Sequence, residues 1–405
     1  MPNHEPILAW IDSQGDRLRS MVVEWANINT GTRNLEGLSR LSGVLKRHLE
    51  LFNTEIEEIP LPAENVIDSK GNLILLPLAP ALSLRKRSKV SLRAFLNIHI
   101  DTVYAKDDPF QTVEQIDENM LRGPGVIDAK GGLAVMLIAL EALERSEAAA
   151  GLGWEVFINT DEEIGSPGSA AFFAEAAKRN HLGLLFEPAM PDGALVSERK
   201  GSGNFSIVFR GRAAHAGRDF GAGRNAIVAA SDFAVQVHRL NGTIPDVTLN
   251  IARIEGGGPA NVVPDLAILR MNARIARRDD QVPVENELNR LAGEIAASHE
   301  VSATLHGHFA SPPKQLDAST RALAGYIEVC GSDLGIPINW RASGGASDGN
   351  KLAAAGLAVI DTFGPRGANL HSPDEFVIVD SLTERAKLAA LLLLKMATGE
   401  LPWPV

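Results

Sequence analysis

Three consecutive acidic residues, Asp161, Glu162 and Glu163, follow an apolar segment and precede a glycine turn in FINTDEEIGSPGS. Carboxylates this close repel each other and raise at least one pKa unless a cation lies between them. A metal ion removes the conflict, and two adjacent glutamates that diverge suit one as ligand and the other as base for a metal-bound water. The alternative is an acidic, solvated loop at a helix N-terminus.

Two other segments place polar side chains where metal ligands are found. His99 and Asp101 end the apolar segment AFLNIHID, and the strand period of two points both to one side, so Asp101 can orient the imidazole. Asp128 lies in the glycine-bounded turn GPGVIDAKGG, where a carboxylate can bridge two cations or cap a helix. Taken singly, a structural histidine and a helix cap are the simpler interpretations.

The last two candidates are Glu187, at the end of the apolar segment GLLFEPA, and His371, in the turn-rich segment GPRGANLHSPDEF. Each is weak evidence alone. Together, the five segments supply two histidines and several carboxylates, which is the ligand set of zinc or a related divalent ion. The single cysteine, Cys330, excludes an internal disulfide and a zinc site made of cysteines.

The elements that must position these residues alternate between strand and helix. The pattern predicts two amphipathic helices within residues 7–53, and then strands at 94–100, 154–159, 183–186 and 358–363 and helices at 132–144, 169–179, 322–329 and 381–396. This alternation indicates an α/β domain with a largely buried sheet.

A different order occupies the middle of the chain. Strands at 204–209, 247–254, 267–275 and 302–308 and helices at 225–240 and 284–298 give the order βαββαβ, a ferredoxin-like unit. We therefore predict a catalytic domain of mixed α/β type at 1–200 and 313–405, into which a smaller domain at 201–312 is inserted.

Composition bounds the remaining properties. A chain of 405 residues exceeds the size of one hydrophobic core, and its 45% apolar and 22% charged content is that of a globular protein. The net charge of −11 argues against a nucleic-acid surface or an anionic membrane partner. We read no export signal and no membrane span, so a cytoplasmic protein is the expectation.

Six motifs, in their order along the chain, are similar to the motifs of one enzyme family. They are HID at 99–101, GPGVIDAKGG at 123–132, DEEIGSPGS at 161–169, FEPA at 186–189, SGGASDGN at 343–350 and HSPDEF at 371–376. The chain resembles the two-zinc peptidases and amidohydrolases that include glutamate carboxypeptidase, acetylornithine deacetylase and succinyl-diaminopimelate desuccinylase. The likeness covers nearly the whole chain and is greatest to the glutamate carboxypeptidase-like branch.

The resemblance implies a role for each candidate ligand. It implies that Asp128 bridges two zinc ions, for which cobalt or manganese can substitute. His99 and Glu187 would complete one metal site, and Glu163 and His371 the other. Glu162 would be the general base, and Asp101 would support His99.

The resemblance also extends to the inserted domain and to a late loop. It implies that His215, in GRAAHAGRDFGAGRNA, reaches the active site of a partner subunit and stabilises the oxyanion, which requires a homodimer joined through the inserted domains. Asn261 and Arg274 would contact substrate, Arg274 by gripping a carboxylate. Gly345 and Asp348 would line the pocket, although turn formation alone also explains them.

These features predict a hydrolase that cleaves the amide bond beside a free carboxylate in a small peptide or N-acyl amino acid. An N-acyl-amino-acid deacylase like acetylornithine deacetylase is the alternative within the class. A catalytically inactive relative that only binds metal is the alternative outside it, and such a protein should have lost its base or a ligand.

Overall fold

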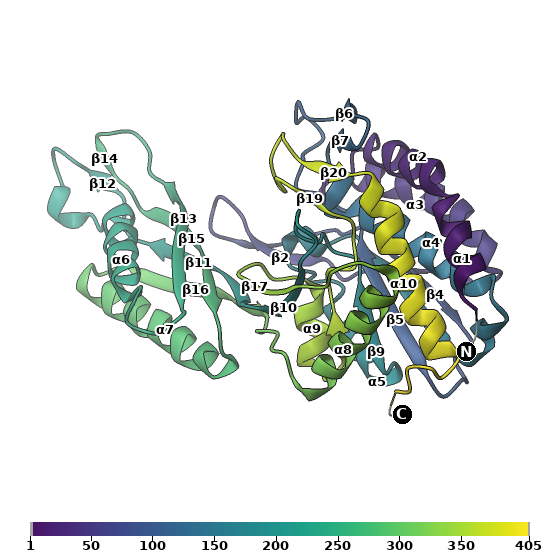
Figure 1. The fold of residues 1–405 in the computed structure, drawn as a ribbon. Coiled ribbons are helices and arrows are strands. Elements are labelled where there is room, and N and C mark those ends of the chain that lie inside the picture. Colours follow the sequence, from purple (N-terminus) through teal and green to yellow (C-terminus); the bar gives the residue numbers. More distant parts are fainter. Residues whose placement is uncertain (1–2, 404–405) are drawn as a thin grey trace.

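The computed structural model describes residues 3–403, which fold into a larger and a smaller unit (Figure 1). The larger unit is built on a mixed six-stranded sheet. Its strands, in order across the sheet, are β1 (Ile56–Ile59), β4 (Ala81–Lys86), β8 (Gly153–Asn159), β5 (Arg93–His99), β9 (Leu182–Leu185) and β18 (Ala358–Ile360). The last four are parallel to one another, β4 pairs antiparallel with β8, and β1 pairs antiparallel with β4. The carboxyl ends of β8, β5 and β9 therefore meet at one edge of the sheet.

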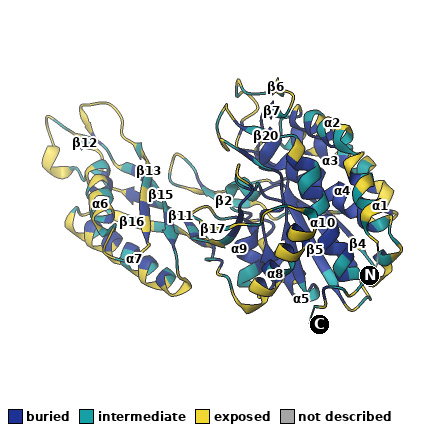
Figure 2. Ribbon diagram, viewed as in Figure 1, coloured by how far each residue is buried: buried dark blue, intermediate teal, exposed yellow. Residues whose placement is uncertain are grey.

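Helices cover both faces of this sheet, as a buried parallel sheet requires. One core contains α1 (Glu5–Asp12), α2 (Gly15–Ala26), α3 (Leu35–Leu49), α4 (Gly132–Glu144), α8 (Ala318–Leu334) and α10 (Asp380–Ala397), and the other contains α5 (Ala170–Arg179) and α9 (Asp348–Ala354). Strand β5 serves both, because Leu96 and Ile98 face the first core and Phe95 faces the second. The central strands β8 and β9 and helix α4 are accordingly buried along nearly their whole length, whereas the edge strand β1 is partly exposed (Figure 2).

The N-terminal segment differs from the prediction of two helices within residues 7–53, because it forms three. Helix α1 ends at Asp12 and α2 begins at Gly15. Ser13 and Gly15 at this break favour a helix end over continuation. The apolar spacing continues across the break because Ile11 and Leu18 are buried in the same core.

The smaller unit contains a four-stranded antiparallel sheet in the order β13-β15-β11-β16. Its elements follow the predicted order βαββαβ: β11 (Gly201–Arg210), α6 (Ala226–Leu240), β13 (Thr248–Gly256), β15 (Leu266–Ile275), α7 (Gln281–Ser298) and β16 (Ser302–Ser311). Helices α6 and α7 share one apolar core with one face of this sheet. Two short strands, β12 (Ala214–His215) and β14 (Val262–Val263), pair at the far end of the unit (Figure 1).

The predicted domain boundaries at 200/201 and 312/313 stay a prediction, although the sheet of the smaller unit spans 201–311. The predicted outer boundaries at residues 1 and 405 lie outside the described residues.

A hairpin that we did not predict connects the two units. Strands β2 (Glu64–Ile67) and β3 (Leu73–Leu76) leave the larger unit, and Ile67 packs with Val208 and Ile268 of the smaller one. Arg210 Nη2 donates to the carbonyls of Lys70, at 2.9 Å, and Gly71, at 3.0 Å. Gly71 has a positive φ, and a Cβ there would lie 2.7 Å from Val208, so the tip approaches the sheet closely because this residue is glycine.

Short strands bring distant segments to the carboxyl edge of the main sheet. β10 (Leu195–Arg199) pairs in parallel with β17 (Trp340–Ser343). A second small sheet has the order β19 (Gly367–Ala368), β20 (Phe376–Ile378), β7 (Met120–Arg122) and β6 (Glu114–Asp117). The pairing of β20 with β7 holds the loop 369–375 next to the segment 123–128.

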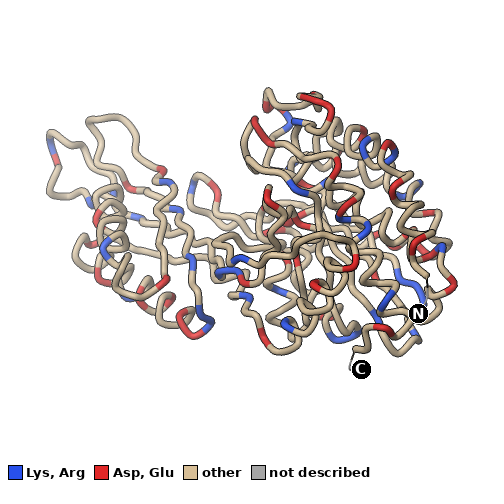
Figure 3. Tube along the Cα trace, in the orientation of Figure 1, with Lys and Arg blue, Asp and Glu red and all other residues tan. Residues whose placement is uncertain are grey.

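Lys and Arg are interspersed with Asp and Glu in both units (Figure 3). Within residues 3–403, no helix combines the length and the apolar character needed to cross a bilayer.

Candidate metal centre

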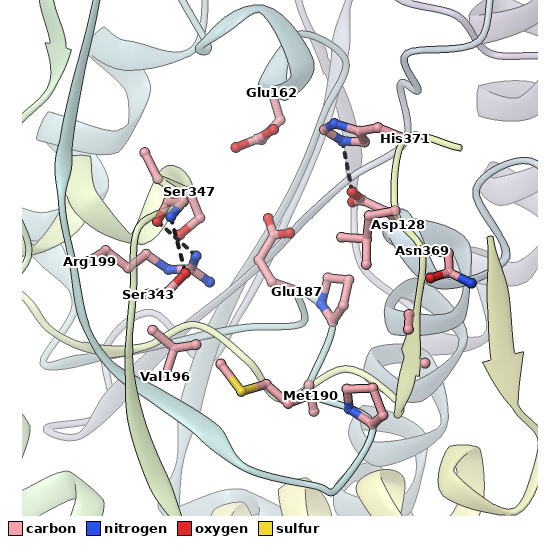
Figure 4. A pocket seen from close by; sticks show the side chains of 18 of the residues that line it. Asp128, Glu162, Glu187, Met190, Val196, Arg199, Ser343, Ser347, Asn369 and His371 are labelled. Carbon is pink, nitrogen blue, oxygen red and sulfur yellow. Dashed lines mark hydrogen bonds and ion pairs between the residues drawn. The ribbon is translucent and has the colours of Figure 1, made fainter. Parts of the chain in front are cut away.

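The five predicted ligands come from separate elements and meet at the carboxyl edge of the main sheet. His99 ends β5, Glu163 lies in the 3-10 turn 162–164 after β8, and Glu187 follows β9. Asp128 lies in the irregular turn 126–131 before α4, and the peptide bond that follows it is cis. His371 lies in the loop between β19 and β20, and its imidazole points toward Asp128 (Figure 4).

Asp128 is the centre of the cluster. Its Oδ1 lies 3.1 Å from His99 Nε2, and its Oδ2 lies 3.2 Å from His371 Nε2. His371 Nε2 is also 3.2 Å from Glu163 Oε2, and His99 Nε2 is 3.8 Å from Glu187 Oε2. Each oxygen of the Asp128 carboxylate thus faces a different histidine, and each histidine is paired with a different glutamate.

Asp101 is more widely engaged than the strand pattern predicts. His99 Nδ1 lies 3.0 Å from the carbonyl oxygen of Asp101 and 3.4 Å from its Oδ1. The carboxylate also accepts hydrogen bonds from the backbone N–H groups of Glu162, at 3.1 Å, and Glu163, at 3.2 Å, and from Thr32 Oγ1, at 2.7 Å. Asp101 therefore orients both His99 and the turn that carries the two glutamates.

Charge in the cluster is unbalanced. Burial and the nearby Asp128 raise the pKa of Glu163 to about 7, and burial and the charge of Glu187 raise the pKa of Glu162 well above its usual range. Asp128 and Glu163 raise the pKa of His371 to about 10. Buried carboxylates that resist ionisation beside imidazoles that attract protons form a site that needs positive charge.

The donor set fits divalent metal ions. His99, Asp128 and Glu163 each offer a ligand atom, and these atoms lie within 4.8 Å of one another. Imidazole nitrogens combined with carboxylate oxygens are typical of zinc and related ions. The nearby ammonium group of Lys130 is buried and donates to Thr30 Oγ1 at 2.7 Å, and burial lowers its pKa to about 8.

A pocket opens beside the cluster. Glu162, Glu187, Arg199, Gly345 and Ser347 are among the residues that line it, together with Asp128, Glu163 and His371 (Figure 4). Glu162 faces Glu187 across this space (Figure 4). A carboxylate in this place can exchange a proton with a molecule bound between the ligands and the pocket.

The predicted substrate-binding residues differ in how close they lie to the pocket. Gly345 lines the pocket, and Arg274 Nη1 lies 3.4 Å from the carbonyl oxygen of the adjacent Gly344. Asp348 lies beneath the pocket, where its carboxylate is 1% exposed and accepts hydrogen bonds from Ser166 Oγ and, at 2.7 Å, from Asn159 Nδ2.

His215 and Asn261 lie far from the metal cluster of their own chain. His215 pairs with Val262 in the β12–β14 ladder, and the N–H of Ala216 donates to the carbonyl of Asn261 at 2.9 Å. This ladder is at the end of the smaller unit that points away from the larger one (Figure 1). Both side chains are exposed.

Two residues of the site are not among those predicted from the sequence. Arg199 lines the pocket, and its Nε donates to Asp361 Oδ2 at 2.8 Å. Glu375 is fully buried behind Asp128, where it accepts hydrogen bonds from backbone N–H groups. Glu375 is within the motif HSPDEF, but an acid in a turn gives no sign of burial. Arg199 ends the short strand β10, where the polar Ser197 and Glu198 precede it, so the local sequence gives no clear signal for its role.

Comparison with known proteins is informative at two levels. The sequence model described as "Peptidase family M20/M25/M40" matches residues 95–395. Carboxypeptidase G2 of Pseudomonas sp. (strain RS-16) is 27% identical over 380 residues, which cover 92% of this chain and 88% of that protein. Succinyl-diaminopimelate desuccinylase of Thioalkalivibrio sulfidiphilus is 25% identical over 335 residues, or 78% and 86% of the two chains.

A solved structure shares the fold over nearly the whole length. It is the Bacillus subtilis protein YXEP, whose title calls it a dinuclear metal-binding peptidase from the M20 family. The two structures superpose with a TM-score of 0.65 at 16% identity, covering 96% of this chain and 99% of the other.

Proposed function

Because the chain belongs to peptidase family M20/M25/M40, we propose that this enzyme hydrolyses the amide bond beside a free carboxylate in a small peptide or an N-acyl amino acid. One observation carries the proposal. Asp128 lies between two histidine–glutamate pairs, and Glu162 faces the pocket that opens beside them.

Five side chains would hold two metal ions. Asp128 would bridge them, His99 and Glu187 would complete one site, and Glu163 and His371 the other. We propose zinc, with cobalt or manganese as substitutes, because imidazole and carboxylate ligands suit all three. When bound, such ions lower the pKa of a coordinated water toward ~7 and polarise a carbonyl group.

Glu162 would be the general base. Its carboxylate lies in the pocket, and the backbone amide of Glu162 is fixed by Asp101 at 3.1 Å. Glu162 would take a proton from the attacking water and return it to the leaving nitrogen.

Arginine would select the substrate. Arg274 reaches the loop that carries Gly345, so a guanidinium group lies near one wall of the pocket. Such a group binds a carboxylate through two parallel hydrogen bonds. A substrate with a free carboxylate next to the scissile amide satisfies this pairing, and a neutral carboxamide does not.

The functional molecule would be a homodimer joined through the smaller units. His215 and Asn261 are exposed at the end of that unit, remote from the metal cluster of their own chain (Figure 1). A dimer with twofold symmetry can bring this end of one subunit to the active site of the other. His215 would then stabilise the oxyanion of the tetrahedral intermediate, and Asn261 would contact substrate.

An N-acyl-amino-acid deacylase is the second candidate. The likeness to a succinyl-diaminopimelate desuccinylase supports it, because that protein's name describes removal of an acyl group from an amino acid. The two candidates share the metal centre and the base and differ in the amino acid and acyl group that the pocket accepts.

A substrate panel tests the proposal. Metal-free enzyme would be loaded with zinc, cobalt or manganese and assayed on N-acyl glutamates, dipeptides and N-acetyl amino acids, each beside its C-terminal carboxamide. We expect free carboxylates to be cleaved with kcat/KM about 100-fold above the carboxamides, because a carboxamide lacks the charge and the second acceptor oxygen with which a carboxylate pairs with a guanidinium group. Cleavage confined to C-terminal glutamate selects the glutamate carboxypeptidase-like branch, and broad deacetylation selects the deacylase.

Glu162→Gln is the control. It should keep its metal and lose about 10²–10⁴-fold in turnover. An active Glu162→Gln variant would refute the assignment of the base. A wild-type enzyme that binds metal and cleaves no member of the panel would point to the inactive relative instead.

A further inference from the structure

The inference concerns Glu375, a carboxylate that is not among the proposed ligands and does not line the pocket. It is 0% exposed, it ends the loop that carries His371, and its carboxylate reaches the turn that carries Asp128. Burying a charge in this way is costly unless hydrogen bonds compensate for the lost water. Its partners therefore indicate what it does.

All the partners of Glu375 are hydrogen-bond donors. Oε1 accepts from the N–H groups of Ile127, at 3.0 Å, and Asp128, at 3.1 Å. Oε2 accepts from the N–H of Gly125, at 3.0 Å, and from the hydroxyl of Tyr104, at 2.7 Å. Burial raises the pKa of Glu375, and these donors oppose that rise. Both oxygens are thus occupied on the side away from the metal cluster.

The loop 369–375, which Glu375 ends, contains strained residues that other contacts must hold in place. Asn369 and His371 both adopt left-handed backbone conformations, which cost energy in residues other than glycine. The imidazole of His371 is half exposed, and the contacts that hold it are those with Asp128 and Glu163. The Tyr104 hydroxyl lies 2.8 Å from the carbonyl oxygen of Ser372, so it also reaches this loop.

We propose that Glu375 is a positioning residue that fixes His371 relative to Asp128 and thereby sets the affinity of the metal site formed by Glu163 and His371. This inference rests on the proposed two-metal function. The carboxylate joins the backbone of the bridging ligand to the loop of one histidine, and His99, on strand β5, does not depend on it. Loss of Glu375 should therefore weaken one metal site more than the other.

Glu375→Gln is the main variant. A glutamine offers one acceptor oxygen, and its NH₂ group would face a backbone donor where the carboxylate now accepts. Metal-free protein would be titrated with Zn²⁺ by calorimetry, and bound metal would be counted after dialysis. We expect the affinity for the second ion, the one held by Glu163 and His371, to fall about 10–100-fold. This is the range seen when partners of metal ligands are removed. The affinity for the first ion should change less than threefold.

The neighbouring carboxylate gives a matched control. Asp374 lies in the same loop, with its side chain 71% exposed and 3.7 Å from Arg122, so Asp374→Asn should bind both ions as the wild type does. Tyr104→Phe removes one of the four donors and should give a smaller loss at the second ion. It carries the test if Glu375→Gln does not fold, as judged by circular dichroism of the metal-free protein.

The outcomes are distinguishable. If wild type binds two ions and Glu375→Gln binds both with unchanged affinity, the positioning role is wrong. Equal losses for both ions would also overturn it, because a general loss of structure has that effect. If wild type itself binds fewer than two ions, the proposed function fails and the inference falls with it.

Discussion

Asp361 is a fully buried carboxylate between two buried cations. Its Oδ2 lies 2.8 Å from Arg199 Nε and 3.0 Å from Lys314 Nζ, and these cations hold its pKa down at about 2. Asp361→Asn leaves both cations without their counter-ion, so we expect unfolding free energy to fall by about 3–5 kcal/mol in urea titrations. The exposed pair of Asp192 with Arg341 gives the control, since Asp192→Asn should cost less than ~1 kcal/mol.

The same variant has a defined pH dependence. A carboxyl group whose pKa is lower when folded stabilises the protein above its unfolded pKa of about 3.9, and this contribution is lost as pH falls toward 2. The difference between wild type and Asp361→Asn should be constant from about pH 7 to 5 and narrow below about pH 4. A difference that does not change with pH would mean that the Asp361 carboxylate does not act through its charge.

Residues with a chemical reason to be acidic or basic at a strand end were predictable. The run Asp161–Glu163 predicts a metal site on electrostatic grounds, whereas Asp128 taken alone is explained equally well as a helix cap and gains its predicted role from the other motifs. Glu375 and Arg199 were missed because their importance comes from burial and from partners distant in sequence. Glu375 binds backbone groups 247 to 250 residues earlier in the chain, and no local pattern encodes that.

At the scale of elements, the hairpin of β2 and β3 is held on the smaller unit by few groups. Arg210 supplies two hydrogen bonds to its tip. In Arg210→Met we expect amide hydrogens of residues 68–73 to exchange about 30-fold faster, since two such bonds together contribute about 2 kcal/mol. Hydrogen exchange followed by mass spectrometry measures this.

An arginine on strand β13 of the same sheet provides the comparison. Arg253 is mostly exposed and pairs with Glu255, so Arg253→Met should leave exchange in the hairpin unchanged. If Arg210→Met behaves in the same way, the apolar contacts of Ile67 and the hydrogen bond from Arg270 Nη2 to the Ile67 carbonyl, at 2.7 Å, are enough to hold the hairpin.

Long, strongly periodic elements were predictable and short ones were not. Helix α4 begins and ends where its apolar run predicts, at Gly132 and Glu144, and the βαββαβ order of the middle segment is observed. The strands missed are mostly two to six residues long, so their pairing depends on distant partners rather than on their own sequence. The N-terminal prediction of two helices was wrong because one core supplies the same apolar spacing to both α1 and α2.

At the scale of the whole molecule, the mixed α/β fold and the family resemblance inferred from the motifs are confirmed. The homodimer stays a prediction, and it is testable by mixing two inactive variants. His215→Ala lacks the group donated to the partner, and Glu162→Gln lacks the base. A heterodimer contains one intact site, so equal mixing with exchange of subunits should restore about a quarter of wild-type turnover. No recovery in mixtures shown to contain heterodimers would exclude the cross-subunit role.

The hairpin also bears on how the two units can move. The chain passes between the two units twice, at the start of β11 and after the end of β16. Ser202 of β11 is paired with Ser311 of β16 where the two crossings meet. Two adjacent crossings can act as a hinge between the units. The hairpin is attached near Arg210, which lies eight residues after Ser202 on β11. At the rise per residue of a β-strand, this attachment is roughly 26 Å from the hinge. The contacts of the hairpin tip oppose rotation of the two units at that distance from the crossing point. Because the lever arm is long, we expect weak bonds there to be enough to hold the angle between the two units.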